Sequence, residues 1–123
     1  MRVVVTGATG NLGTALLRRL AGRGDVEVVA VARRRPEGEL AANVRFVAAD
    51  VAADDLEPVF GGADALVHLA WLFQPTHRPD LTWEANVGGT ARVLQAAARA
   101  RVRTVVYSSS VGTYSPGRRT VDE

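Results

Sequence analysis

Residues 6–13 read Thr6-Gly7-Ala8-Thr9-Gly10-Asn11-Leu12-Gly13, and this stretch decides the fold. It follows an apolar run, Arg2–Thr6, and precedes Asn11–Arg23, which carries leucine and alanine at helical spacing. A continuous apolar run is typical of a strand buried on both faces of a parallel sheet. The stretch therefore predicts a tight turn from a buried strand into an amphipathic helix.

The three glycines of this turn carry a chemical prediction. Gly7 lets the chain turn sharply, and Gly10 lets a pyrophosphate approach the backbone because no Cβ stands in the way. Gly13 lets the first helix lie close to the sheet. The N-terminus of that helix offers N–H groups and the positive end of the helix dipole to phosphate oxygens. We therefore expect dinucleotide binding, because an ordinary tight turn does not explain three glycines.

Outward from this turn, the chain alternates short β-branched runs with helical stretches. Strands are expected at Arg2–Thr6, Val26–Ala32, Val44–Ala48, Ala65–Ala70 and Thr104–Tyr107. A short helix through Phe60 is capped by Asp54 or Asp55, and a long one runs from Asp80 or Thr82 to about Arg101. The alternation predicts an α/β fold, a doubly wound parallel sheet of the Rossmann type with five strands in the order 3-2-1-4-5. Ligands of such sheets bind just beyond the carboxyl ends of the strands.

Composition limits the other function classes. The 123 residues suit one domain, and 47% apolar with 23% charged residues is ordinary for a soluble globular protein. The chain has no cysteine, which excludes disulfides and thiolate metal sites, and its two histidines make a metal centre unexpected. All 15 basic residues that count toward the net charge of +2 are arginines. A charge this small gives no reason to expect nucleic acid as a partner. No apolar run approaches the roughly 18–20 residues of a membrane span, so we expect no membrane contact and a cytoplasmic location.

The residues after the second and third strands bear on the cofactor. Dinucleotide folds usually place an acid after the second strand, but here Ala32 is followed by Arg33-Arg34-Arg35. Because guanidinium pairs well with phosphate, Arg33 favours NADP over NAD, although a solvated basic loop would have the same sequence. After the third strand, Asp50-Val51 supplies an acid that can accept a hydrogen bond from the adenine amino group. A helix cap or a solvated acid is the alternative for Asp50.

The motifs taken together resemble the extended short-chain dehydrogenase/reductase family, the NAD-dependent epimerase/dehydratase group. The resemblance rests on the turn at residues 6–13, Asp50-Val51, His68-Leu69-Ala70, Asn86-Val87-Gly88-Gly89-Thr90, and Ser108-Ser109-Ser110-Val111-Gly112-Thr113-Tyr114. It covers essentially the whole chain and keeps the order of the family's motifs.

This resemblance implies roles for individual residues. The turn would hold the pyrophosphate, and the acid-apolar pair Asp50-Val51 would contact adenine. The segment after the fourth strand would line the ribose and nicotinamide, and a helix asparagine would lie near the cofactor. The implied cofactor-binding residues, with Arg33, are Gly7, Gly10, Asn11, Leu12, Gly13, Asp50, Val51, Leu69, Ala70, Trp71 and Asn86. The third serine, Ser110, would hydrogen-bond the reacting oxygen. The departure from NAD-using members lies at Ala32.

Plainer interpretations stand beside several of these roles. His68 on an apolar strand is more simply a hydrogen-bonded core histidine than a catalyst. Asn86 could bond only to neighbouring backbone. Trp71 could equally cover the sheet or form a wall of the substrate site.

Family members transfer hydride with a Tyr-x-x-x-Lys pair, and this chain contains no lysine. We therefore expect residues 1–123 to be the N-terminal NAD(P)-binding part of a longer enzyme, inactive alone. The longer enzyme would act as a sugar-nucleotide epimerase or dehydratase, or as a carbonyl reductase on a small-molecule substrate. The alternative is a non-catalytic NADP sensor resembling NmrA-like regulators. An uncovered fifth strand would also favour a homo-oligomer.

Overall fold

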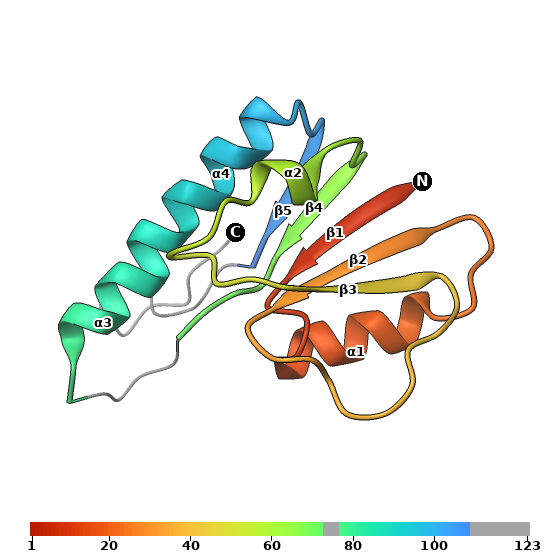
Figure 1. Cartoon of the computed structure of the whole chain (residues 1–123), viewed down its shortest axis with the longest axis horizontal. Helices are drawn as coiled ribbons and strands as arrows, with labels where there is room; N and C mark the ends of the chain where they lie inside the picture. Colours follow the sequence, from red (N-terminus) through yellow and green to blue (C-terminus); the bar gives the residue numbers. More distant parts are fainter. Residues whose placement is uncertain (73–76, 109–123) are drawn as a thin grey trace, which may run out of the picture.

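The computed structural model describes residues 1–72 and 77–108 and shows the expected alternation of strands and helices (Figure 1). In chain order the elements are β1 (Arg2–Thr6), α1 (Asn11–Leu20), β2 (Glu27–Ala32), β3 (Val44–Ala48), α2 (Glu57–Phe60), β4 (Ala65–His68), α3 (Pro79–Trp83), the π-helix η1 (Glu84–Gly88), α4 (Gly89–Arg99) and β5 (Thr104–Tyr107). The α/β class expected from the sequence is confirmed.

The strands form one parallel sheet in the order β3-β2-β1-β4-β5, as the sequence predicts. The opening strand β1 lies at the centre, with Val4 opposite Val29 of β2 and opposite Leu66 of β4. The strand order therefore reverses between β1 and β4. In sheets of this kind, that reversal opens a crevice at the carboxyl ends of the strands.

Helices cover both faces of the sheet, with α1 on one side and α2 and α4 on the other (Figure 1). Successive residues of a strand point to opposite faces. Val3 and Val5 of β1 accordingly join the cluster that contains Leu17 of α1. Val4 points the other way, into the cluster that contains Phe60 of α2 and Val93 of α4. Both faces of β1 are thus buried, which explains its unbroken apolar sequence.

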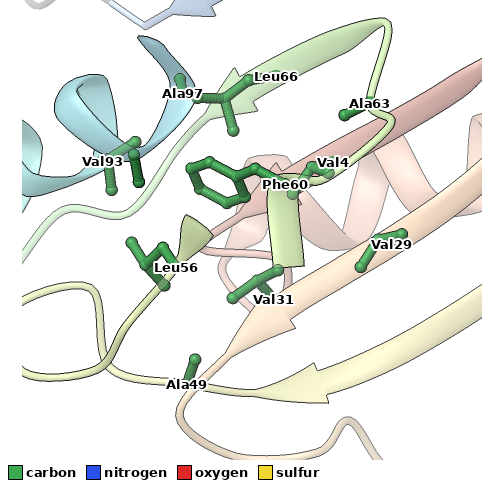
Figure 2. Packing of buried hydrophobic residues seen from close by; sticks show 11 residues of the cluster. Val4, Val29, Val31, Ala49, Leu56, Phe60, Ala63, Leu66, Val93 and Ala97 are labelled. Atoms are coloured by element: carbon green, nitrogen blue, oxygen red, sulfur yellow. The ribbon is translucent and has the colours of Figure 1, made fainter. Parts of the chain in front are cut away.

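Phe60 is the largest fully buried side chain of the second cluster. Figure 2 shows its ring among Val93 and Ala97 of α4 and the sheet residues Val4 and Leu66. Burial of an aromatic ring of this size stabilises a fold by roughly 2–3 kcal/mol. The main contribution of the short helix α2 to the core is therefore the side chain of Phe60.

The first helix ends at Leu20, so the expected end at Arg23 is wrong. The chain leaves the helix at Ala21, and Gly22 takes a left-handed conformation with φ of 74°. Asn43, which precedes β3, closes this turn from outside. Its Nδ2 donates to the carbonyl oxygens of Leu20, Arg23 and Val26, and its Oδ1 accepts from the Gly22 N–H.

The fourth strand is also shorter than expected, ending at His68 rather than Ala70. Its neighbour β1 ends at Thr6, whose carbonyl oxygen accepts the Leu69 N–H at 3.0 Å. Because β1 turns away at Gly7, Leu69 and Ala70 have no strand left to pair with on that side. They leave the sheet at the point where the strand order reverses.

The long helix begins at Pro79, before either expected cap, and continues to Arg99 through a π-helical segment at Glu84–Gly88. Proline suits this first position because its missing N–H would have no helical partner. Thr82 does not cap the helix; its hydroxyl donates to the carbonyl oxygen of Arg78 at 3.2 Å. A π segment inside a helix often marks a functional site.

Candidate functional site

A cleft of about 670 Å³ opens at the carboxyl ends of β1, β2, β3 and β4. Eight of the residues predicted to bind a cofactor line it together: Gly7, Gly10, Arg33, Asp50, Val51, Leu69, Ala70 and Trp71. They come from four separate segments of the sequence. The structure therefore brings the predicted residues to one site where the strand order reverses.

Gly7 lines the cleft where the turn after β1 meets the segment after β4. Its φ is +70°, and a Cβ added to it would lie 2.6 Å from Ala70 N and from the Leu69 carbonyl group. Both the conformation and the space therefore require glycine. Gly10 follows and donates its N–H to the Gly7 carbonyl oxygen at 3.0 Å. A Cβ added to Gly10 would stand 3.3 Å from that same oxygen, so the turn is tight at this position too.

Gly13 lies on the buried side of α1, where a Cβ would overlap the Gly7 carbonyl oxygen and stand 2.7 Å from Ala8 Cα. Gly13 therefore lets α1 lie directly against the turn that follows β1. Asn11, Leu12 and Gly13 form the first turn of α1 beside the cleft and are not among the residues that line it. Leu12 is 64% exposed. Their contact with a cofactor stays a prediction.

The N-terminus of α1 has the properties of an anion-binding helix end. It begins directly after Gly10, no side chain caps it, and its first turn contains no acidic residue. The last turn instead carries Arg18 and Arg19, which favour the negative end of the helix dipole. A phosphate at the N-terminus would meet no competing carboxylate from this helix.

Two arginines stand at the end of β2. Ala32 is buried, while Arg33 and Arg34 are exposed and line the cleft. No acid replaces Ala32 at the strand end. The edge of the cleft at β2 therefore carries two exposed guanidinium groups.

The loop after β3 is folded around Asp50. Asp50 Oδ1 accepts the Ala52 N–H at 2.9 Å, and the Asp50 N–H donates to Asp54 Oδ2 at 2.7 Å. Arg92 of α4 donates to the carbonyl oxygens of Ala53 and Asp54, both at 3.0 Å. Helix α4 thus fixes the position of this loop, while Asp50 keeps a place in the lining of the cleft.

Asn86 has the backbone partners that the plainer interpretation predicts. Its Nδ2 donates to the Leu72 carbonyl oxygen at 2.9 Å, and its Oδ1 accepts the Leu72 N–H at 2.7 Å. The side chain is 5% exposed and does not line the cleft. Asn86 therefore ties the segment after β4 to the π-helix, and its direct contact with a cofactor stays a prediction.

His68 is a fully buried core residue, as its apolar strand indicates. Its Nδ1 lies 2.6 Å from the Thr6 hydroxyl, and its Nε2 lies 3.0 Å from the Thr90 hydroxyl. The ring stacks on Tyr107, with centroids 5.3 Å apart. Burial lowers the pKa of His68 from 6.5 to about 4, so the ring is neutral at physiological pH.

Other lining residues were not expected from the sequence. Leu81, Glu84 and Ala85 face the cleft from the long helix. Helical periodicity in the sequence could have shown that these three residues share one helix face. Only the strand order shows that this face lies at the carboxyl ends of the strands. Trp71 is 55% exposed and lines the cleft, which favours a place in the wall of the site and not a role in covering the sheet. Ser110, the candidate catalytic residue, lies outside the described residues.

Comparison with known proteins assigns the chain to a family. The model of the NAD-dependent epimerase/dehydratase family matches residues 3–123, so the chain belongs to that family. It is 36% identical over 110 residues to an L-arabinose 1-dehydrogenase (NAD(P)(+)) of Haloferax volcanii, covering 89% of this chain and 41% of that enzyme. It is 40% identical over 111 residues to an uncharacterised protein of Mycobacterium tuberculosis, covering 89% of this chain and 12% of that protein.

A solved structure of MoeE5 in complex with UDP-glucose and NAD has a TM-score of 0.81 and 29% identity. The match covers 98% of this chain and 40% of that one. The chain thus spans less than half the length of each of these relatives. Over residues 1–72 and 77–108, no helix is both long and apolar enough to cross a bilayer.

Proposed function

We propose that residues 1–123 bind NADP or NAD and serve as the cofactor-binding part of an oxidoreductase, epimerase or dehydratase. One observation carries the proposal: Gly7 and Gly10 line the cleft beside the uncapped N-terminus of α1. A diphosphate bound there would receive backbone N–H groups and the positive end of the dipole. Asp50 and Val51 would face the adenine, and Leu69 to Trp71 the ribose and nicotinamide.

NADP is the preferred cofactor in this proposal. Arg33 and Arg34 line the cleft at the end of β2, where a 2′-phosphate would lie, and Ala32 supplies no carboxylate to repel it. The Haloferax volcanii relative is named as an NAD(P)(+) enzyme, whereas MoeE5 was solved with NAD. The arginines of this chain are therefore the basis for the preference.

The substrate class rests on the family and its relatives. A small carbonyl or hydroxyl compound, such as a sugar or a sugar nucleotide, is proposed for the whole enzyme, with Ser110 at the reacting oxygen. The chain of 123 residues contains no lysine, so it lacks a Tyr-x-x-x-Lys pair, and we propose that it transfers no hydride alone. A non-catalytic sensor would bind the same cofactor. Assays of the whole protein for epimerisation or carbonyl reduction separate these two functions.

Cofactor binding is tested by titrating the chain with NADP⁺ and NAD⁺ and following tryptophan fluorescence, since Trp71 lies in the cleft. Gly10→Ala adds a methyl group at the proposed diphosphate site, 3.3 Å from the Gly7 carbonyl oxygen, and should raise both Kd values at least tenfold. The matched control is Gly24→Ala, whose Cβ meets nothing within 4 Å. Equal affinity of Gly10→Ala and Gly24→Ala would contradict the proposal.

Cofactor preference is tested with a second pair of variants. Replacement of Arg33 and Arg34 together by alanine should raise the Kd for NADP⁺ about tenfold and leave the Kd for NAD⁺ within twofold. Arg35→Ala is the control, because Arg35 is exposed beside the same strand but does not line the cleft. Equal losses for the two nucleotides would remove the case for NADP.

A further inference from the structure

The side chain of His68 joins two elements of the fold beneath the cleft. Its two ring nitrogens contact the hydroxyls of Thr6, at 2.6 Å, and Thr90, at 3.0 Å. Thr6 is the last residue of β1, and Thr90 is the second residue of α4. The imidazole therefore spans the distance from the central strand to the helix that packs on its face.

Each of these threonines is next to a residue that shapes the cleft. Thr6 precedes Gly7, which has no room for a Cβ beside Leu69 and Ala70. Thr90 follows Gly89, where a Cβ would stand 3.1 Å from Val51 Cγ2. His68 itself precedes Leu69, whose N–H donates to the Thr6 carbonyl oxygen. Three walls of the cleft are therefore connected to one buried ring.

The chemistry of this contact suits a neutral imidazole. Such a ring has one N–H donor and one acceptor nitrogen, and a hydroxyl can both donate and accept. Both contacts can therefore be satisfied at once in either tautomer. A methyl or phenyl group in place of the imidazole would leave the fully buried hydroxyl of Thr6 without this partner.

We infer that His68 is a positioning residue of the cleft: the bridge from Thr6 through its ring to Thr90 sets the separation of the Gly7 turn, the segment after β4 and the loop at Val51. The inference rests on the proposed function of the cleft as a nucleotide site. His68 and Thr90 do not line the cleft, so they act on a bound nucleotide only through the walls. Their replacement should change affinity without removing any ligand contact.

The sharpest variant is Thr90→Val, which removes one hydroxyl and keeps the shape of the side chain. Its matched control is Thr82→Val, because Thr82 is a buried helical threonine whose hydroxyl bonds to the Arg78 backbone instead. We expect Thr90→Val to raise the Kd for NADP⁺ at least fivefold, and Thr82→Val to stay within twofold of the wild-type chain. Urea unfolding of both variants shows whether they lose similar stability.

Two variants at His68 complete the design. His68→Gln keeps a donor and an acceptor and should bind NADP⁺ within about threefold of the wild type, whereas His68→Leu should lose more than tenfold. In ¹⁵N-labelled protein, the His68 ring shifts should report a neutral ring with one preferred tautomer, and Thr90→Val should alter that preference.

The outcomes are distinct. If the wild-type chain binds neither NADP⁺ nor NAD⁺, the proposed function fails and this inference falls with it. If the wild type binds but Thr90→Val weakens binding no more than Thr82→Val, the cleft remains a nucleotide site and the role of His68 is overturned. A selective loss in Thr90→Val, with recovery in His68→Gln relative to His68→Leu, supports the positioning role.

Discussion

Gly89 of α4 lies against the side chain of Val51, so closely that a Cβ on Gly89 would stand 3.1 Å from Val51 Cγ2. The preceding glycine, Gly88, faces open space, with nothing within 4 Å of its hypothetical Cβ. Two adjacent glycines in one motif therefore differ in function. Gly89 lets the long helix approach the loop at Asp50, whereas packing does not require glycine at position 88.

The two glycines give a matched pair of substitutions. Gly88→Ala should raise the free energy of unfolding by up to about 1 kcal/mol, because alanine is favoured over glycine inside helices. Gly89→Ala should give a smaller gain, since Val51 must move by a few tenths of an ångström. Urea unfolding of both variants measures the difference, and equal gains would show that the Gly89–Val51 contact is unimportant.

A second prediction concerns the turn between β1 and α1. Gly13→Ala should prevent stable folding, because its Cβ would overlap the Gly7 carbonyl oxygen and lie 2.7 Å from Ala8 Cα, both backbone atoms that cannot move away. Gly24→Ala is the control and should change the free energy of unfolding by less than about 0.5 kcal/mol. Circular dichroism with thermal unfolding distinguishes the two, and a Gly13→Ala chain as stable as the control would refute the close approach of α1.

Asn43 should be one of the more important polar residues for stability. Its side chain makes hydrogen bonds with four backbone groups around the end of α1. Asn43→Ala should lower the free energy of unfolding by about 2 kcal/mol. Asn43→Asp should be at least as harmful, because it places a carboxylate against three carbonyl oxygens. Glu37→Ala, in an exposed loop, serves as the neutral control.

Stability should fall as the pH is lowered through the range of the His68 titration. Burial lowers the pKa of this ring from 6.5 to about 4, so the unfolded chain binds more protons than the folded one between these values. The neutral His68 ring therefore makes its whole contribution to the free energy of unfolding above pH 6.5. This contribution decreases toward pH 4, by about 3 kcal/mol in all. Among residues 1–72 and 77–108, the ring forms hydrogen bonds with two threonine hydroxyls and stacks on the Tyr107 ring.

Carboxylates also titrate near pH 4, so the His68 contribution is obtained by difference. His68→Gln should show a smaller decrease in stability between pH 6.5 and 4.5 than the wild type when urea unfolding is measured at each pH. Identical slopes for the two proteins would mean that the buried ring does not remain neutral.

The outer edge of β5 gives a prediction on assembly. Among the described residues β5 pairs only with β4, and all of its residues are exposed, including Val105 at 42% and Val106 at 51%. Unpaired strand edges favour association with another chain. We therefore expect the chain to form homo-oligomers at high concentration in sedimentation experiments, and Val106→Lys to reduce this. A monomer at every concentration would contradict the prediction.

The sequence predicted most of the fold because its strands are short apolar runs with clear ends. Val44–Ala48 and Thr104–Tyr107 have the predicted bounds, and the strand order is the predicted one. The predicted end of β4 was wrong because Leu69 and Ala70 are as apolar as the residues of a strand. Only the turn of the neighbouring β1 at Gly7 makes them leave the sheet.

The cleft was largely predictable for a similar reason. Its residues follow strands, and in a parallel sheet the carboxyl ends of all strands lie at one edge. What the sequence does not reveal are contacts between distant segments, such as those of Asn43 with the α1 turn. The π-helical segment at Glu84–Gly88 likewise has no signal in a sequence that reads as one continuous helix.

Gly7 and Gly10 line the cleft and have no side chains. A scan that truncates side chains deletes no atom at these two positions and therefore gives no information on them. Mutagenesis there becomes informative only when it adds bulk, so a map of this site must be drawn with insertions of methyl groups instead of truncations.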